Sequence, residues 1–199
     1  MILIDLLTEE GIVGRSYLQP YTAKAVRYLI PAFHDFSDLL KGYGVAPIEL
    51  HELARKSLHF VGYQGLAVIA VSGLDMAAWD ALAKAAGLPL CVLLGGTGGP
   101  VKAYNSNGLW LRNPELVGAE ATELRDEGGF TGLKLRLGRE NAWDDLKAIH
   151  AVRASVGDAC HLMVDFNQGL DFAEALYRGH LIDDLGLDWI EKADHLRQF

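Results

Sequence analysis

The chain has 199 residues, of which half are apolar and 9% aromatic, and its formal net charge is −8. A chain of this size can bury one large or two small hydrophobic cores. The acidic balance argues against a nucleic-acid partner, because binding to a phosphate backbone requires clustered Lys and Arg. We therefore expect a globular protein that binds a small molecule.

The cysteines and the apolar segments bear on where the protein resides. Cys91 and Cys160 lie in apolar runs with no second thiol nearby, so we interpret both as small buried residues and expect no disulfide. Residues 66–71 form the longest apolar window, which is too short to span a bilayer, and no basic leader precedes the first strand. These features predict a cytoplasmic protein without a membrane partner.

The first half of the chain predicts a hairpin followed by helices. The predicted segments, in chain order, are strands over 2–7 and 12–18 and helices over 22–42, 47–58 and 66–86. Gly11 lies in the turn of the hairpin, and the last helix is apolar on nearly all sides, as a buried central helix is. An isolated hairpin is marginal in water, so we expect a further strand that precedes Met1 to be missing.

A glycine-rich stretch over 93–100 separates the two halves. It has two interpretations, a linker and a phosphate-binding loop. A phosphate loop needs a strand before it and a helix with Gly-Lys-Ser/Thr after it, and neither is present, so we favour the linker. We place the domains at 1–98 and 99–199.

The second half alternates between strand and helix patterns. The predicted strands are 101–106, 132–137, 161–166 and 188–191, and the predicted helices are 114–127, 143–155 and 172–185. Strands separated by helices with short loops form parallel βαβ units with right-handed crossovers. Four such units make half of an eight-stranded β/α barrel.

Charged residues mark the ends of the predicted strands. Lys134 and Arg136 are two residues apart and therefore point to the same face. Leu133, Leu135 and Leu137 point the other way, toward the covering helices. Asp165, Asn167 and Glu191 follow at the carboxyl ends of the next two strands, where the carboxylates can pair with these cations or hold a divalent ion. Interior salt bridges without a function are the alternative. We favour a function, because barrel interiors are normally aliphatic and buried charge is costly.

Several motifs along the chain resemble one known family. They are GLDMAAWDAL at 73–82, GLPL at 87–90, LLG at 93–95, AYNS at 103–106, KLR at 134–136, VGD at 156–158, MVDFNQ at 163–168 and WIE at 189–191. Together they resemble the mandelate racemase and muconate-lactonizing branch of the enolase superfamily, and within it mandelate racemase most. The resemblance implies an α/β protein with an α+β capping domain, followed here by the first half of a β/α barrel. It also implies that Mg²⁺ holds a small carboxylate substrate while a base removes its α-proton.

The resemblance assigns roles to individual residues. Asp165 and Glu191 match the first two of three metal ligands, and Lys134 matches the first lysine of a Lys-x-Lys pair that stabilises the substrate carboxylate. Arg136 stands where the family usually has a basic lysine, and a guanidinium is a poor proton acceptor. This substitution therefore argues against racemisation at that face.

Two further positions, Ser106 and Asn167, match residues that contact substrate in the family. Lys192 and Ala193 follow Glu191 where the family has Glu-Pro. The third metal ligand, the opposite-face base and four barrel strands would lie beyond Phe199. We therefore expect weak or absent Mg²⁺ binding by this chain.

Two functions remain open at this point. One is Mg²⁺-assisted α-proton abstraction from a 2-hydroxy acid or acid sugar, by a racemase or dehydratase. The other is a catalytically inactive half-barrel. Because an open half-barrel exposes sheet edges and an apolar inner face, we expect a homo-oligomer that covers them.

Overall fold

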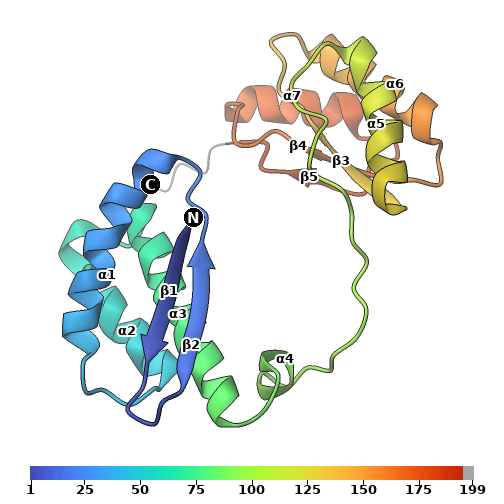
Figure 1. Ribbon diagram of the computed structural model, residues 1–199. Coiled ribbons are helices and arrows are strands. Elements are labelled where there is room, and N and C mark those ends of the chain that lie inside the picture. Colours follow the sequence, from blue (N-terminus) through green and yellow to red (C-terminus); the bar gives the residue numbers. More distant parts are fainter. Residues whose placement is uncertain (195–199) are drawn as a thin grey trace. The chain divides into compact units, whose positions relative to one another are not determined.

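The structure is a computed structural model that describes residues 1–194 (Figure 1). The chain divides into two compact units within the glycine-rich stretch, one of them Met1–Gly99 and the other beginning at Pro100. Each unit has its own hydrophobic core. The two units are described separately below.

The first unit is a β-hairpin covered by helices. Its elements are β1 (Ile2–Leu7), β2 (Val13–Leu18), the 3-10 turn η1 (Ala23–Ala25), α1 (Val26–Leu40), α2 (Pro47–Ser57), the 3-10 turn η2 (His59–Val61), α3 (Leu66–Ala85) and α4 (Leu90–Leu93). The strands pair antiparallel from Ile2 opposite Leu18 to Leu7 opposite Val13, and Gly11 adopts a φ of +80° in the turn. The predicted hairpin is confirmed. The predicted first helix instead begins as a 3-10 turn and becomes α-helical only at Val26.

The hairpin packs closely on α3 because glycines remove side chains from the interface. A Cβ added to Gly14 of β2 would lie 2.1 Å from the carbonyl oxygen of Ala77 and 2.7 Å from the Cβ of Ala81. A Cβ on Gly73 of α3 would meet the methyl groups of Ile4 and Leu18 at 2.7 and 2.8 Å. Such an approach leaves no room for a larger residue. The predicted central helix with a small-residue surface is therefore confirmed.

The length of α3 corrects one expectation. Within residues 1–194, α3 alone is long and apolar enough to cross a membrane, so the expectation that no apolar segment reaches that length is wrong. The sequence window ended too early because polar Ser72 and Asp75 interrupt it. In the structure α3 packs against β1, β2, α1 and α2, and its buried residues belong to the core of the first unit. This packing is that of a core helix.

The second unit is a parallel sheet with helices between its strands. Its elements are α5 (Pro114–Gly128), β3 (Gly132–Arg136), α6 (Ala142–Val156), β4 (His161–Asp165), α7 (Phe172–Ile182) and β5 (Ile190–Glu191). The strands lie in the order β3-β4-β5 and pair in parallel. Leu133, Leu135 and Leu137 are fully buried in the core formed with the helices, as the two-residue period predicted.

The two outer strands are shorter than predicted. Of the strand expected over 101–106, only Asn105 pairs with its neighbour, through a single bridge to Leu133. The strand expected over 188–191 is reduced to Ile190–Glu191. A strand with one neighbour gains backbone hydrogen bonds on one side only, so a bend costs it little. The Asn105 amide also donates to the carbonyl of Leu124, which draws the segment toward α5.

The cysteine prediction holds for one residue and fails for the other. Both cysteines are free thiols, and Cys160 is buried in the core of the second unit. Cys91 is exposed, so its assignment as a buried residue is wrong. It lies in the four-residue helix α4, which is too short to bury one face against the rest of its unit.

Candidate functional site

Four charged side chains converge at the carboxyl ends of the three strands of the second unit. The parallel register sets Arg136 of β3 opposite Asp165 of β4, and Asp165 opposite Glu191 of β5. Lys134 lies two residues before Arg136 on β3, so its side chain points to the same face of the sheet. We call these four residues, Lys134, Arg136, Asp165 and Glu191, the rim cluster. The structure thus brings together the four charged residues that the sequence singled out.

Asp165 is the centre of the rim cluster. Its Oδ2 lies 2.5 Å from Nη1 of Arg136 and 3.3 Å from Nζ of Lys134. Its Oδ1 accepts the backbone N–H of Asn167 at 2.7 Å. The side chain is only 4% exposed. Both oxygens of this buried carboxylate are therefore already compensated by donors, two of which carry positive charge.

Glu191 and Lys134 hold each other in the charged state. Nζ of Lys134 donates to Oε2 of Glu191 at 2.9 Å, and this hydrogen bond lowers the pKa of Glu191 despite its partial burial. Burial by itself would lower the pKa of Lys134, but the hydrogen bonds to Glu191 and Asp165 outweigh it and raise the pKa. Lys134 is therefore a fixed cation, suited to holding an anion rather than accepting a proton.

Arg136 is held on two sides. Its guanidinium carbon lies 5.3 Å from the centre of the Trp110 ring, in a cation–π contact, while Nη1 pairs with Asp165. A guanidinium keeps its proton at any physiological pH and cannot serve as a general base. Sequence reasoning did not identify Trp110, because it lies in the irregular segment before α5, where no period assigns a direction to a side chain.

The loops that follow β4 and β5 are strained next to the rim cluster. Asn167, Gln168 and Lys192 have positive φ values of 52°, 62° and 47°. Residues other than glycine rarely adopt such values. The N–H of Gln168 donates to the carbonyl of Lys192 at 2.7 Å and ties the two loops together. Backbone strain of this kind is concentrated at functional sites.

The predicted substrate-contacting residues differ in their placement. Asn167 lies two residues after Asp165 and donates its backbone N–H to the carboxylate of Asp165. Ser106 is exposed and follows Asn105, the residue that bridges to β3. The contact of Ser106 and Asn167 with substrate stays a prediction.

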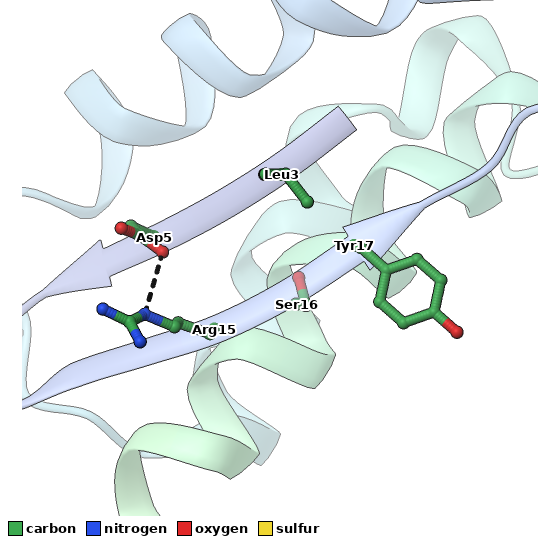
Figure 2. A pocket seen from close by; sticks show the side chains of 5 residues that line it. All are labelled: Leu3, Asp5, Arg15, Ser16 and Tyr17. Atoms are coloured by element: carbon green, nitrogen blue, oxygen red, sulfur yellow. Dashed lines mark ion pairs between the residues drawn. The ribbon is translucent and has the colours of Figure 1, made fainter. Parts of the chain in front are cut away.

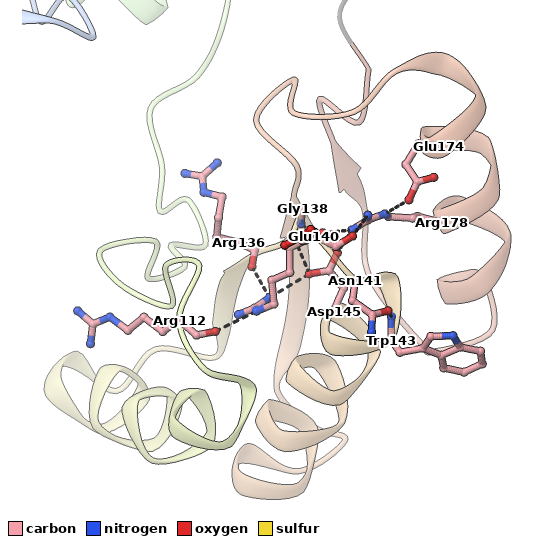
Figure 3. A network of polar contacts seen from close by, with 10 residues as sticks. Arg112, Arg136, Gly138, Glu140, Asn141, Trp143, Asp145, Glu174 and Arg178 are labelled. Atoms are coloured by element: carbon pink, nitrogen blue, oxygen red, sulfur yellow. Dashed lines mark hydrogen bonds and ion pairs between the residues drawn. The ribbon is translucent and has the colours of Figure 1, made fainter.

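A second polar network is centred on Asp145 and fixes the turn that follows β3 (Figure 3). The Asp145 carboxylate of α6 accepts from the guanidinium of Arg139 at 3.0 Å and from that of Arg178 of α7 at 2.7 Å. Arg139 also donates to the carbonyl oxygens of Arg112 and Arg136. The network thus connects α6 and α7 to the backbone of the residue that pairs with Asp165. Sequence reasoning missed it, since Arg178 lies 33 positions from Asp145 and no local period relates the two.

Other polar groups of the first unit do not form a comparable site. His51 lies between Asp75 and Tyr63, with both hydrogen bonds at 3.3 Å. A shallow pocket on the hairpin is lined by Leu3, Asp5, Arg15, Ser16 and Tyr17 (Figure 2). The charges in this pocket, Asp5 and Arg15, pair with each other at 3.5 Å and are more than half exposed. Neither place gathers groups that face a common reacting atom.

The donor chemistry of the rim cluster suits a hard divalent cation, but the number of ligands is low. Asp165 and Glu191 offer carboxylate oxygens, which Mg²⁺ prefers. Among residues 1–194, no three His, Cys, Asp or Glu side chains lie close enough together to hold a metal ion. The residues described could therefore supply two protein ligands, with water completing the coordination.

Comparison with family models matches both units. Residues 1–95 match the model described as "Mandelate racemase / muconate lactonizing enzyme, N-terminal domain". Residues 116–194 match the model described as "Enolase C-terminal domain-like".

Two curated relatives illustrate the range of reactions among similar proteins. L-Talarate/galactarate dehydratase of Salmonella typhimurium is 40% identical over 66% of this chain and 33% of the relative. 3,6-Anhydro-alpha-L-galactonate cycloisomerase of Streptomyces coelicolor is 32% identical over 96% of this chain and 53% of the relative.

Two solved structures share the fold along nearly the whole chain. An enolase from alpha pretobacterium bal199 with bound Mg is 59% identical with a TM-score of 0.92, and the match covers 98% of this chain and 55% of that one. An enolase from Bradyrhizobium complexed with magnesium and mandelic acid is 38% identical with a TM-score of 0.86, and the match covers 96% of this chain and 53% of that one. The chain thus spans about half the length of these solved relatives.

Proposed function

This chain belongs to the mandelate racemase / muconate lactonizing enzyme family, and from that premise we propose that its rim cluster serves metal-assisted removal of the α-proton of a small carboxylate. The proposed substrate is a 2-hydroxy acid or an acid sugar. One observation carries the proposal, the convergence of Lys134, Arg136, Asp165 and Glu191 at the carboxyl ends of three adjacent parallel strands. In β/α barrels that end of the strands is where catalytic residues gather.

The chemistry requires positive charge at a fixed place. An α-proton next to a carboxylate is very weakly acidic, and the enediolate left by its removal must meet preorganised cations and donors. Asp165 and Glu191 are the residues that would hold Mg²⁺, which when bound supplies charge to stabilise the developing enediolate. Lys134, held protonated by its two carboxylate partners, would bind and orient the substrate carboxylate. Ser106 and Asn167 would contact the substrate.

The nature of Arg136 narrows the reaction type. Racemisation needs a proton acceptor on each face of the α-carbon, and a guanidinium cannot be one of them. Dehydration needs one base to remove the α-proton and an acid to assist departure of the β-hydroxyl. Dehydration therefore fits Arg136 better than racemisation does. The proton acceptor would be a group other than the four residues of the rim cluster.

One observation favours a second candidate function, that of a non-catalytic protein that self-associates. Tyr104 and Trp189 form an edge-to-face pair with ring centres 5.4 Å apart, yet both rings are among the exposed large hydrophobic residues of the second unit. Such exposed aromatic surface favours association with another polypeptide. Analytical ultracentrifugation tests this candidate, and a compact monomer at micromolar concentration would exclude it.

Proton exchange tests the proposed chemistry directly. The protein is incubated in D₂O with excess Mg²⁺ and a panel of 2-hydroxy acids and acid sugars, and loss of the α-proton signal is followed by NMR. We expect exchange above the protein-free rate that is abolished by Lys134→Ala. Lys147→Ala is a suitable control, because Lys147 pairs with Asp144 on the exposed surface of α6. Exchange that is absent for the whole panel, or unaffected by Lys134→Ala, would count against the proposal.

A further inference from the structure

We propose that Arg136 is an internal competitor for the divalent cation and sets the metal affinity of the rim cluster. The inference rests on the proposed function for the identity of Asp165 and Glu191 as metal ligands. It goes further in giving Arg136, which stands where the family has a basic lysine, a role in metal binding rather than in proton transfer. The argument comes from the pairing of each carboxylate oxygen.

The oxygens that would bind a metal are already occupied by donors of the chain itself. Oδ2 of Asp165 faces two cationic nitrogens, at 2.5 Å from Arg136 and 3.3 Å from Lys134, while Oδ1 accepts a backbone N–H. In Glu191, Oε2 accepts from Lys134 and Oε1 lies 3.2 Å from Nζ of Lys192. A divalent cation that binds Oδ2 of Asp165 must therefore compete with a guanidinium and an ammonium group for a nearly buried oxygen.

Arg136 is a stronger competitor than the lysines because it is held in place. Its guanidinium lies between the Trp110 ring and Asp165, and its backbone carbonyl accepts from Arg139. An arginine fixed in this way loses little side-chain entropy when it pairs with a carboxylate. The ammonium group of Lys134 is shared between two carboxylates, so it can move toward Glu191 when a metal takes Asp165.

The expected change in metal affinity follows from the strength of the contact between Arg136 and Asp165. A hydrogen bond between charged groups typically changes an equilibrium by about 10- to 100-fold. We therefore expect Arg136→Met to tighten divalent-metal binding by about that factor. Trp110→Leu removes the cation–π contact and keeps every charge, so it should tighten binding by a smaller factor, about two- to fivefold.

The experiment is a titration of the metal-free protein with Mn²⁺, followed by the EPR signal of the free ion. Mn²⁺ accepts the same oxygen ligands as Mg²⁺ and reports binding without any need for activity. Arg125→Met is the matched control, because it removes the same charge from a half-buried arginine of α5 that pairs with its neighbour Asp126. Asp165→Asn shows whether the bound metal uses the rim cluster at all. Circular dichroism verifies that each variant is folded.

Each outcome decides the question. Tighter Mn²⁺ binding by Arg136→Met, with Arg125→Met unchanged, supports the competition. Equal or weaker binding by Arg136→Met overturns it, as does an absence of binding in both the parent and that variant. If Arg136→Met does not fold, the decision passes to Trp110→Leu, and unchanged affinity there overturns the inference. Mn²⁺ binding that survives Asp165→Asn would show that the proposed metal site itself is wrong. Mn²⁺ binding that is lost in Asp165→Asn but is not tightened in Arg136→Met refutes the competition alone.

Discussion

Replacement of Asp145 by asparagine should strongly destabilise the second unit. The Asp145 side chain is 3% exposed and pairs with Arg139 and Arg178, whose side chains are 9% and 6% exposed. It also accepts the backbone N–H groups of Gly138 and Arg139, at 3.0 and 3.2 Å. The asparagine has nearly the same shape but no charge, so two buried guanidinium groups lose their shared counterion.

The expected magnitude follows from that loss. Removing one partner of a buried ion pair typically costs about 3–5 kcal/mol, because the remaining charge stays buried without compensation. Arg178 still pairs with Glu174 in the variant, and this pair limits the cost of burying the Arg178 guanidinium without Asp145. We therefore expect Asp145→Asn to lower the free energy of unfolding by about 3 kcal/mol, within that range. Urea denaturation followed by circular dichroism and tryptophan fluorescence measures this change.

The neighbouring residue supplies a matched control. Asp144 precedes Asp145 on α6 and pairs with Lys147 at 2.9 Å, with side chains that are 37% and 69% exposed. Exposed pairs of this kind contribute at most about 1 kcal/mol, so Asp144→Asn should have a small effect. If Asp145→Asn is no more destabilising than Asp144→Asn, the reasoning that the buried network holds the turn after β3 is refuted.

Two further predictions concern the first unit. Gly14→Ala should destabilise by about 1–3 kcal/mol or more, since its Cβ would overlap α3, whereas Gly44→Ala meets no atom within 4 Å and should be nearly neutral in thermal denaturation. Hydrogen bonds from Lys84 and from the backbone N–H of Arg15 lower the pKa of Asp80, so its contribution to stability is present above the ordinary pKa of 3.8 and is lost as the pH falls through the lowered value. Asp80→Asn should therefore flatten the acid side of the stability–pH profile, and an unchanged profile would contradict this assignment.

The sequence by itself determined the order of elements and the direction of the site residues. The two-residue period of β3 placed its leucines in the core and Lys134 and Arg136 on the opposite face, because successive strand side chains must alternate. The parallel βαβ order then placed Asp165 and Glu191 at the same edge of the sheet, so the rim cluster could be predicted from local rules and one topological rule. The family followed from motifs in both halves of the chain.

Only the tertiary structure decided which atoms meet. The pairing of Arg136 with Asp165, its contact with Trp110 and the pairing of Asp145 with Arg178 join residues that are about 26 to 33 positions apart, and no local period specifies such contacts. The reduction of the strand expected over 101–106 to the single bridge at Asn105 has the same origin. Strand propensity is a property of the segment, whereas the length of a strand depends on the neighbours that accept its hydrogen bonds.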